Sequence, residues 1–381
     1  MTQSWSLECS KCGRTESAEG LPTVCPDCGS PWLVRYAKAP APDVRGALAA
    51  RPWTMWRYRE WLPLSGDEEP VTLGEGMTPL LRWAPLERSL KLATVWIKDE
   101  GKNPTGSFKA RGLAAAVTAA RRNGAKSFTI PTAGNAGVAL AAYARRAGIP
   151  VDVFAPRTTP ATILNQIRAF GATLNLLDGH IGDCGKAARE FAAKHGAFDV
   201  STLREPYRIE GKKTMGLELA EQLGWKLPDV VIYPAGGGTG LIGMWKAFNE
   251  LRAAGWITDP SPRFYAVQST GCAPVVKAFE AGDEQTASWP NPETAAAGLR
   301  VPGPLGGRLM LTALRESKGG AMAVSDPDLL RWAATLAEQG LDASPEGGAA
   351  VAALEALVAR GDVRSSDRVV IFNTGAGWLY R

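Results

Sequence analysis

The pattern of hydrophobic and polar positions alternates from about residue 90 onward. Short apolar runs typical of strands are separated by longer segments with helical spacing. The predicted strands are Thr94–Lys98, Ser127–Pro131, Val151–Ala155, Thr173–Leu177, Val230–Tyr233, Phe264–Gln268 and Arg368–Phe372. The predicted helices are Ser107–Asn123, Ala136–Ala147, Pro160–Phe170, Cys184–His195, Leu241–Ala254 and Glu346–Ala359. This alternation predicts an α/β fold with parallel or mixed twisted sheets flanked by helices.

In such sheets, ligands bind where loops leave the carboxyl ends of strands. The loops after Lys98, Pro131 and Tyr233 are therefore the candidate sites for chemistry. The proline-rich segments 39–43 and 288–304 are interpreted as a linker and a loop.

Composition narrows the chemistry further. The chain has 381 residues but only two histidines, His180 and His195, so a Ser-His-Asp triad or a histidine-rich metal centre is not expected. Proton transfer must then come from lysine, carboxylates, hydroxyls or a cofactor.

No stretch approaches the ~18 apolar residues of a membrane span, and the N-terminus has no signal-peptide core, which favours a cytoplasmic protein.

The net charge of +5 is distributed in short pairs rather than patches. Arg121-Arg122, Arg145-Arg146 and Lys212-Lys213 are expected on solvated helix faces. No interleaving of basic and aromatic residues is present, so neither nucleic acid nor a membrane is an expected partner.

Four of the six cysteines form two Cys-x-x-Cys pairs near the N-terminus: Cys9 and Cys12, then Cys25 and Cys28. Two such pairs can place four thiolates around one ion, as in a structural zinc site with no open coordination position. The alternatives are a ribbon folded without metal, or two disulfides. Cys184 and Cys272 have no such partner and are interpreted as ordinary thiols.

Three loops carry candidate chemistry. The segment Asn103-Pro-Thr-Gly-Ser-Phe-Lys109 places a lysine in a first helical turn, where the positive helix end favours a depressed pKa, as a Schiff-base lysine requires. Thr132-Ala133-Gly134-Asn135 offers hydroxyl, amide and backbone N–H groups for a carboxylate or ring hydroxyl, unless Asn135 simply caps a helix. Gly236-Gly237-Gly238-Thr239-Gly240 suits a phosphate monoester. The set of lysine, amide and phosphate cradle matches pyridoxal phosphate.

These motifs, together with Asn373-Thr374-Gly-Ala-Gly377, resemble those of threonine synthases, which belong to the tryptophan-synthase-β-like fold type II of pyridoxal phosphate enzymes. The resemblance covers essentially the whole chain, including the cysteine ribbon. It implies that Lys109 binds the cofactor covalently and transfers protons. It further implies that Asn135 contacts the ring hydroxyl, Gly236, Gly237, Gly238, Thr239 and Gly240 bind the cofactor phosphate, and Thr374 meets the pyridine nitrogen. Thr132, Ala133 and Gly134 would receive the carboxylate of an amino-acid substrate.

The resemblance also implies a domain plan and an assembly. A zinc ribbon would occupy residues 1–36, a large α/β domain residues 37–109 and 206–381, and a small α/β domain residues 110–205. The enzyme would be a homodimer.

One segment departs from the family. Threonine synthase eliminates phosphate from O-phosphohomoserine and adds water, and an Asn-Pro-x-Arg-x-Glu-Gly-x-Lys-Thr segment helps to bind the substrate phosphate. Here Glu205 replaces the asparagine, and a carboxylate there repels phosphate unless Arg204 or Arg208 offsets it. Alternatively, Glu205 pairs with an arginine and points away.

Three functions therefore stay open. The leading hypothesis is a lyase of the threonine synthase type or a close paralogue. The second is β-elimination or β-replacement on another amino acid, as in serine or threonine deaminases, diaminopropionate ammonia-lyase or cysteate synthase. The third is a non-catalytic regulator that keeps the fold as a binding module, against which the intact Lys109 and glycine loop argue.

Overall fold

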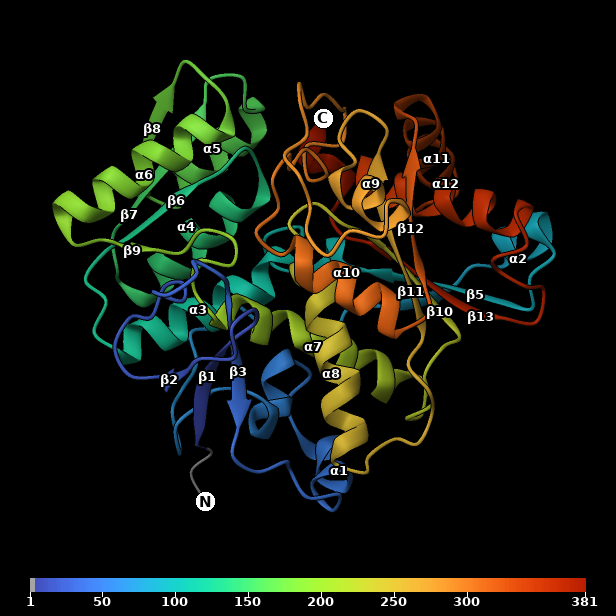
Figure 1. Cartoon of the computed structure of the whole chain (residues 1–381), viewed down its shortest axis with the longest axis horizontal. Coiled ribbons are helices and arrows are strands. Elements are labelled where there is room, and N and C mark those ends of the chain that lie inside the picture. The colour runs from blue at the N-terminus through green and yellow to red at the C-terminus, as the bar shows by residue number, and fades with distance from the viewer. Residues whose placement is uncertain (1–3) are drawn as a thin grey trace. The chain divides into compact units, whose positions relative to one another are not determined.

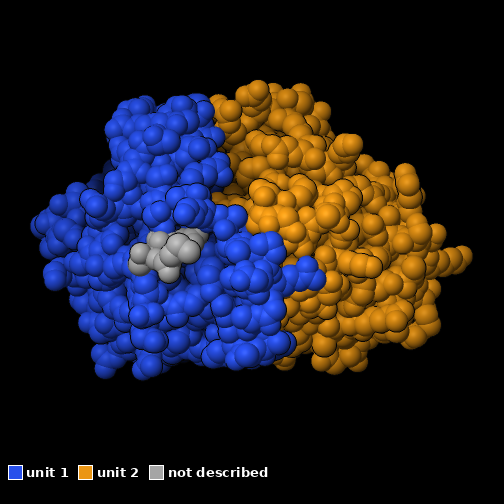
Figure 2. Space-filling model, turned by 90° about the horizontal axis from the view of Figure 1, so that it is seen from below, with its two compact units in different colours: residues 1–76, 103–105, 109–214 blue, residues 77–102, 106–108, 215–381 orange. Residues whose placement is uncertain are grey.

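The computed structural model describes residues 4–381 (Figure 1), so the first three residues of the expected ribbon lie outside the described residues. The chain divides into two compact units, which Figure 2 colours separately. Unit 1 takes in the chain up to Gly76, Asn103–Thr105 and Lys109–Thr214. Unit 2 takes in Met77–Lys102, Gly106–Phe108 and Met215–Arg381.

Unit 2 is built on a six-stranded sheet. In spatial order its strands are β12 (Gly320–Val324), β11 (Arg263–Ser269), β10 (Val230–Pro234), β13 (Arg368–Asn373), β5 (Thr94–Asp99) and β4 (Leu80–Arg82). Neighbouring strands are parallel except β4, which pairs antiparallel with β5. The central strands are almost continuous apolar runs because a parallel sheet is covered on both faces.

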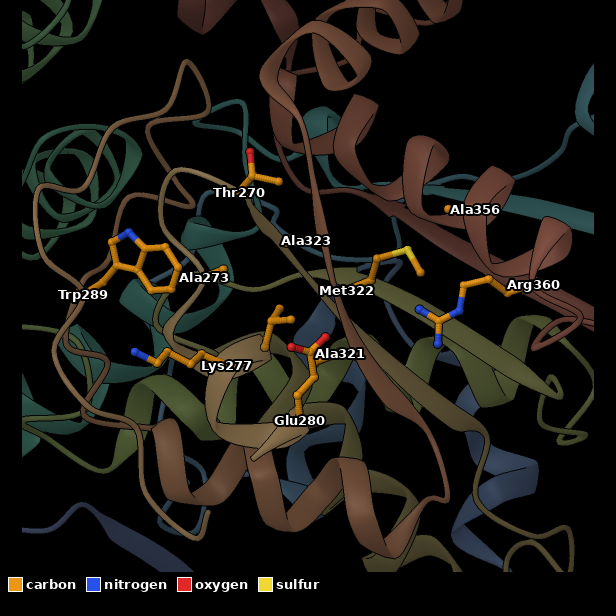
Figure 3. A pocket seen from close by; sticks show the side chains of 11 residues that line it. Thr270, Ala273, Lys277, Glu280, Trp289, Ala321, Met322, Ala323, Ala356 and Arg360 are labelled. Atoms are coloured by element: carbon orange, nitrogen blue, oxygen red, sulfur yellow. The ribbon is translucent and has the colours of Figure 1, made fainter. Parts of the chain in front are cut away.

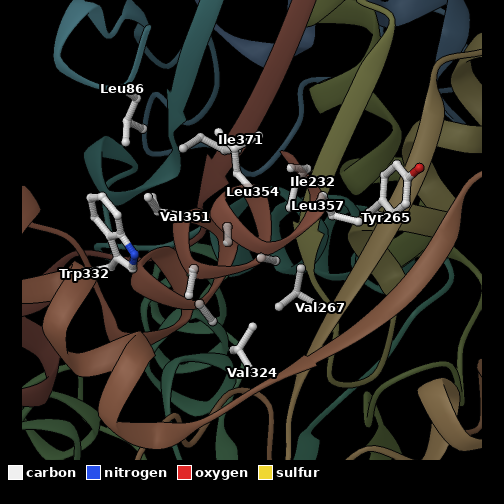
Figure 4. Packing of buried hydrophobic residues seen from close by; sticks show 14 of the residues in the cluster. Leu86, Ile232, Tyr265, Val267, Val324, Trp332, Val351, Leu354, Leu357 and Ile371 are labelled. Carbon is white, nitrogen blue, oxygen red and sulfur yellow. The ribbon is translucent and has the colours of Figure 1, made fainter. Parts of the chain in front are cut away.

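Helices flank this sheet. They are α2 (Ala84–Leu90), α8 (Thr239–Ala253), α9 (Pro274–Glu280), α10 (Gly307–Glu316), α11 (Asp326–Glu338) and α12 (Pro345–Ala359), with 3-10 turns η3 (Glu100–Lys102) and η4 (Gly377–Tyr380). Strand residues Ile232, Val267 and Ile371 share one hydrophobic cluster with Leu354 and Leu357 of α12 (Figure 4). Burial of these side chains contributes hydrophobic stabilisation to unit 2.

Unit 1 contains a four-stranded parallel sheet. Its order is β8 (Thr173–Leu177), β7 (Val151–Pro156), β6 (Phe128–Pro131) and β9 (Phe198–Asp199). Its helices are α3 (Lys109–Arg122), α4 (Asn135–Ala147), α5 (Ala161–Ala169) and α6 (Ile181–His195). Helices α4 and α6 end at left-handed Gly148 and Gly196, where the absence of a side chain removes the steric cost of that conformation.

The N-terminal part of unit 1 is a three-stranded antiparallel ribbon. Strand β1 (Trp5–Cys9) lies between β2 (Thr15–Ser17) and β3 (Trp32–Tyr36). Short turns follow as α1 (Val44–Ala47), η1 (Leu48–Ala50) and η2 (Met55–Trp61).

The predicted strands and helices are confirmed, with ends that differ by at most three residues. Helix α3 begins at Lys109 rather than Ser107, because the backbone of Ser107 forms a bridge with Gly375. The segments 39–43 and 288–304 contain no helix or strand, as expected for a linker and a loop. Among the described residues, no helix combines the length and apolar character needed to cross a membrane.

Helix α7 (Tyr207–Gln222) was not among the predicted helices, and the unit boundary falls within it at Thr214. The expectation that Lys212-Lys213 lies on a solvated face is wrong, since both side chains are fully buried in α7. By contrast, Arg121 and the pair Arg145-Arg146 are exposed, as expected. A buried cation pair is costly unless it is compensated, which makes α7 unusual.

Candidate active site and metal centre

The four ribbon cysteines converge on one point. The Sγ atoms of Cys9, Cys12, Cys25 and Cys28 all lie within 4.8 Å of one another. The Sγ separations are 3.4 Å for Cys9 and Cys28, 3.7 Å for Cys12 and Cys25, and 3.8 Å for Cys12 and Cys28. Tetrahedral zinc with bonds of about 2.3 Å requires sulfur separations of about 3.8 Å. The cluster therefore has the dimensions of a four-thiolate metal site, whereas a disulfide would require about 2.05 Å.

Each cysteine pair forms the same tight knuckle. The Gly13 N–H donates to the Cys9 carbonyl at 3.2 Å, and the Gly29 N–H donates to the Cys25 carbonyl at 2.8 Å. Both glycines are left-handed, with φ of +74° and +67°, which explains why glycine follows each second cysteine. The remaining two cysteines are buried elsewhere, where burial raises the pKa of the thiols of Cys184 and Cys272.

In unit 2, three candidate loops leave one edge of the sheet. Strands β10, β13 and β5 are adjacent and parallel, so their carboxyl ends meet. The glycine loop follows β10, Thr374 follows β13, and the segment that leads to Phe108 follows β5. The fold thus gathers motifs that are separated by more than 100 residues in sequence.

Backbone hydrogen bonds join the segment before Lys109 to the segment after β13. The Phe108 N–H donates to the Thr374 carbonyl at 3.1 Å, and the Ala376 N–H donates to the Gly106 carbonyl at 2.8 Å. The ring of Phe108 also packs edge-on against Tyr233, with centroids 6.0 Å apart. Lys109 is the next residue in the chain, so its position follows from that of Phe108.

The neighbouring Asn373 fixes the carboxyl end of β13. Its amide donates to the Asp99 carboxylate at 2.8 Å, and its side-chain oxygen accepts from the Ser344 N–H at 3.2 Å. Burial raises the pKa of Asp99, which lies at the end of β5. These bonds link the ends of β5 and β13, and the motif analysis did not assign them a role.

The glycine loop is shaped by close contacts that admit no side chain. A Cβ on Gly236 would lie 2.1 Å from the Gly298 carbonyl oxygen, and one on Gly240 would lie 1.9 Å from the Tyr233 hydroxyl. Gly238 has a φ of +79° and is the N-cap of α8, where no side chain caps the helix. Uncapped N–H groups at a helix start suit an anion, and this geometry fits a phosphate.

Two lysines of this region have different environments. The Nζ of Lys98 is fully buried and donates to the Thr78 carbonyl at 2.7 Å, the Glu218 carboxylate at 2.9 Å and the Gln222 side chain at 2.8 Å. Three acceptors satisfy its three N–H groups, so Lys98 is a structural ion-pair residue. Lys109 instead is half-buried at the first residue of α3.

In unit 1, the edge that carries the Thr132–Asn135 loop also carries Glu205. Strands β6 and β9 are adjacent and parallel, so the loop after β6 and the segment Val200–Glu205 after β9 leave the same edge. Thr132 organises its loop: its hydroxyl donates to the Gly134 carbonyl at 2.8 Å and accepts from the N–H groups of Gly134 and Gly137, each at 3.1 Å. Gly134 is the N-cap of α4, so the alternative in which Asn135 caps this helix is wrong.

Glu205 caps the start of α7. Its carboxylate accepts from the Tyr207 N–H at 2.7 Å and from the Arg208 N–H at 3.1 Å. Burial raises the pKa of Glu205 to about 7, although the Arg208 charge and these backbone N–H groups oppose that rise. The side chain is therefore turned to the helix start, and its assignment to substrate binding stays a prediction.

Arg208 is a fully buried guanidinium with spare donors. Its Nη1 donates to the Val200 carbonyl at 2.7 Å, whereas Nε and Nη2 have no hydrogen-bond partner among the described residues. Buried N–H groups without an acceptor are rare because each costs about 1–3 kcal/mol. This guanidinium is therefore a candidate anion-binding group, and the sequence named it only as an offset to Glu205.

One open cavity lies apart from all predicted site residues. It has a volume of about 490 Å³ and lies beside the edge strand β12 in unit 2 (Figure 3). Trp289, Lys277 and Met322 are among its lining residues. None of the motif residues contributes to it, so it is not part of the candidate active site.

Comparisons with known proteins identify the family to which this chain belongs. The family model described as pyridoxal-phosphate dependent enzyme matches residues 71–375. The threonine synthase of Methanosarcina acetivorans is 33% identical over 373 residues, which cover 97% of this chain and 91% of that protein. The threonine synthase of Mycobacterium bovis is 35% identical over 331 residues, or 86% of this chain and 89% of that protein.

Solved structures show the same fold. Maize serine racemase superposes with a TM-score of 0.68 at 23% identity, covering 79% of this chain and 88% of that one. The processed form of threonine deaminase isoform 2 from Solanum lycopersicum superposes with a TM-score of 0.66 at 23% identity, covering 78% of this chain and 83% of that one. The chain thus belongs to the pyridoxal-phosphate dependent enzyme family, as a threonine synthase-like lyase of fold type II.

Proposed function

We propose that this enzyme converts O-phosphohomoserine to threonine and inorganic phosphate. The observation that carries the proposal is the buried guanidinium of Arg208, with two N–H groups that have no protein acceptor among the described residues. A phosphate is a strong acceptor for such a fork of donors. The names of the sequence relatives support the same reaction.

The local structure weakens the electrostatic objection to this substrate. Glu205 occupies the position where the family resemblance leads us to expect asparagine, but its carboxylate accepts from the backbone at the start of α7. With a pKa raised to about 7 by burial, this carboxyl is only partly ionised near neutral pH. The repulsion of a substrate phosphate is accordingly smaller than a full unit charge would produce.

For the cofactor residues we propose the roles that their motifs predict. The uncapped start of α8 and its glycine loop would hold the cofactor phosphate, Thr374 would face the pyridine nitrogen, and Asn135 would bind the ring hydroxyl. When bound, pyridoxal phosphate supplies an electron sink for carbanions at the substrate. Lys109 would anchor the cofactor and move protons at the substrate carbons, and the loop from Thr132 to Gly134 would bind the substrate carboxylate.

Replacing the lysine tests the catalytic assignment. Lys109→Ala should lose the visible absorbance of the lysine-bound cofactor and lower phosphate release by about 10²–10⁴-fold or more, the range for a lost proton-transfer group. Lys102→Ala removes an exposed lysine from the same segment and should retain both signals. Full activity in the Lys109 variant would disprove its role.

A substrate screen tests the reaction itself. The purified enzyme, incubated with O-phosphohomoserine, should release phosphate and form threonine in equal amounts. Keto-acid formation from serine, threonine or diaminopropionate, without phosphate release, would instead support the second hypothesis of β-elimination. A protein that takes up pyridoxal phosphate but turns over none of these amino acids would support the regulator hypothesis.

We further propose that the cysteine cluster binds one structural zinc ion. The matched knuckles and sulfur separations support this site. Mass spectrometry of the native protein should find one zinc per chain, and Cys25→Ser should lose it.

The family resemblance also supports a homodimer, for which light scattering should give twice the chain mass of 40.4 kDa.

A further inference from the structure

The metal ribbon shares a hydrophobic cluster with the helices of unit 1. The ribbon contributes apolar side chains and two of the metal-ligating cysteines, and α3 and α7 contribute small and aromatic residues. The buried members are Leu7, Cys9, Cys25, Trp32, Val34, Ala116, Ala119 and Tyr207. Because two ligands belong to this cluster, metal binding and packing against α7 are parts of one structural element.

A polar contact fixes the ribbon to the first turn of α7. The Tyr36 hydroxyl, at the last residue of β3, donates to the Glu210 carboxylate at 2.5 Å. Lys213 forms an ion pair with the same carboxylate at 2.7 Å, and both charged side chains are fully buried. The Lys213 ammonium also lies 4.3 Å from the centroid of the Tyr36 ring, within the range of a cation–π interaction.

The same turn of α7 carries the candidate anion-binding guanidinium of Arg208. Glu205 caps it, and Arg208 lies within it. A second ribbon contact comes from the Tyr207 hydroxyl, which donates to the Ala18 carbonyl at 3.2 Å. Displacement of this turn would move the Arg208 guanidinium together with its cap, because both are tied to one backbone segment.

We propose that Tyr36 is a positioning residue for substrate binding, through which the metal-loaded ribbon holds the first turn of α7. The inference rests on the proposed function in one respect, namely that this turn binds the anionic group of the substrate. Tyr36 acts through its hydrogen bond to Glu210 and its contact with Lys213. Loss of the metal or of the Tyr36 hydroxyl loosens the turn and weakens substrate binding, while the chemical step at Lys109 continues.

Tyr36→Phe tests this role because it removes the hydroxyl and keeps the ring over Lys213. Hydrogen exchange should become faster in peptides that cover residues 205–214. The KM for the substrate should rise about tenfold, as expected for one lost hydrogen bond to a charged group, with kcat changed less than twofold. Tyr143→Phe is the matched control, since it removes a second tyrosine–glutamate hydrogen bond, from Tyr143 to Glu75 at 2.7 Å, and should leave exchange at 205–214 unchanged.

Removal of the metal is a second test of the proposal. Chelation of the zinc from the holoenzyme, or Cys12→Ser, should accelerate exchange at 205–214 as in Tyr36→Phe, without loss of the cofactor absorbance. Unchanged exchange at 205–214 after both Tyr36→Phe and metal removal overturns the proposal. Faster exchange with an unchanged KM also overturns it, because the turn would then not contribute to substrate binding.

The exchange measurement separates this inference from the proposed reaction. If the wild-type enzyme fails to release phosphate from O-phosphohomoserine, the proposed function fails, while the exchange at 205–214 still reports whether the ribbon holds the turn. The KM is then measured with whichever amino acid the screen shows to be turned over.

Discussion

Two buried helices of this enzyme are stabilised in opposite ways. Helix α12 in unit 2 consists mainly of alanine, glycine, valine and leucine, with one buried carboxylate at its start, Glu346, and it packs into the hydrophobic cluster of the six-stranded sheet. The first half of α7, which belongs to unit 1, is just as buried but carries Arg208, Glu210, Lys212 and Lys213, all without solvent exposure. Burying charge costs free energy that apolar packing would not, so the charges in α7 need compensating partners, of which the Glu210–Lys213 ion pair is one.

The largest effect is expected from the apolar helix. Leu354→Ala in α12 leaves a cavity in the cluster and should lower the free energy of unfolding by about 2–5 kcal/mol. Urea denaturation measures this loss, and the specific activity of the folded fraction should not change. Leu330→Ala, on the exposed face of α11, serves as the control and should change stability by less than about 0.5 kcal/mol.

Helix α7 should respond in the opposite way: a substitution there should reduce activity and leave stability intact. Arg208→Met should lower kcat/KM for a phosphorylated substrate by about a hundredfold, which corresponds to about 3 kcal/mol. Its thermal stability should be equal or higher, because the variant replaces a buried guanidinium, two of whose nitrogens have no hydrogen-bond acceptor among the described residues, with an apolar side chain. A variant with a lower melting temperature and an unchanged kcat/KM would remove the distinction between the two helices.

The cap of α7 should make stability depend on pH. Glu205 has a native pKa of about 7, raised by burial above its unfolded value, so the unfolded state binds fewer protons between these two values. Its stabilising contribution is complete below the unfolded pKa and is lost as the pH rises through 7, by up to about 3 kcal/mol. Glu205→Gln should remove this dependence in urea denaturation at pH 5 and pH 8.

Exposed Glu338 on α11 provides a control, because Glu338→Gln should reproduce the wild-type dependence on pH. If the stability of wild type and of Glu205→Gln depended on pH in the same way, burial would not raise the pKa of Glu205 in the native state.

The smallest effect concerns the cap of α12. The Ser344 hydroxyl accepts from the Gly347 N–H at 3.2 Å, so Ser344→Ala should cost about 1 kcal/mol of stability. Because a hydroxyl does not titrate in this range, the loss should be the same at pH 5 and pH 8. If the stability lost in Ser344→Ala varied with pH, the hydroxyl cap of α12 would not differ from the carboxylate cap of α7 in its pH dependence, as we predict it does.

The strands and helices that follow apolar periodicity, including β10, β13 and α12, could be predicted from the sequence alone. The sequence also determined the cysteine pairs, since spacing and glycine conformation suffice to form a knuckle. The motifs around Lys109 and Gly236–Gly240 predicted the cofactor, and the family match confirms that class. These features are local, so a short stretch of chain contains the information that specifies them.

The tertiary structure alone decided which distant residues meet. Helix α7 was not predicted because a charged segment normally indicates a solvent-exposed one, whereas here the ribbon and α3 share a hydrophobic cluster with its first residue. The contact of Phe108 with Thr374 and the link from Tyr36 to Glu210 join segments that are far apart in the chain. Such contacts depend on strand order and helix packing, which no local pattern encodes.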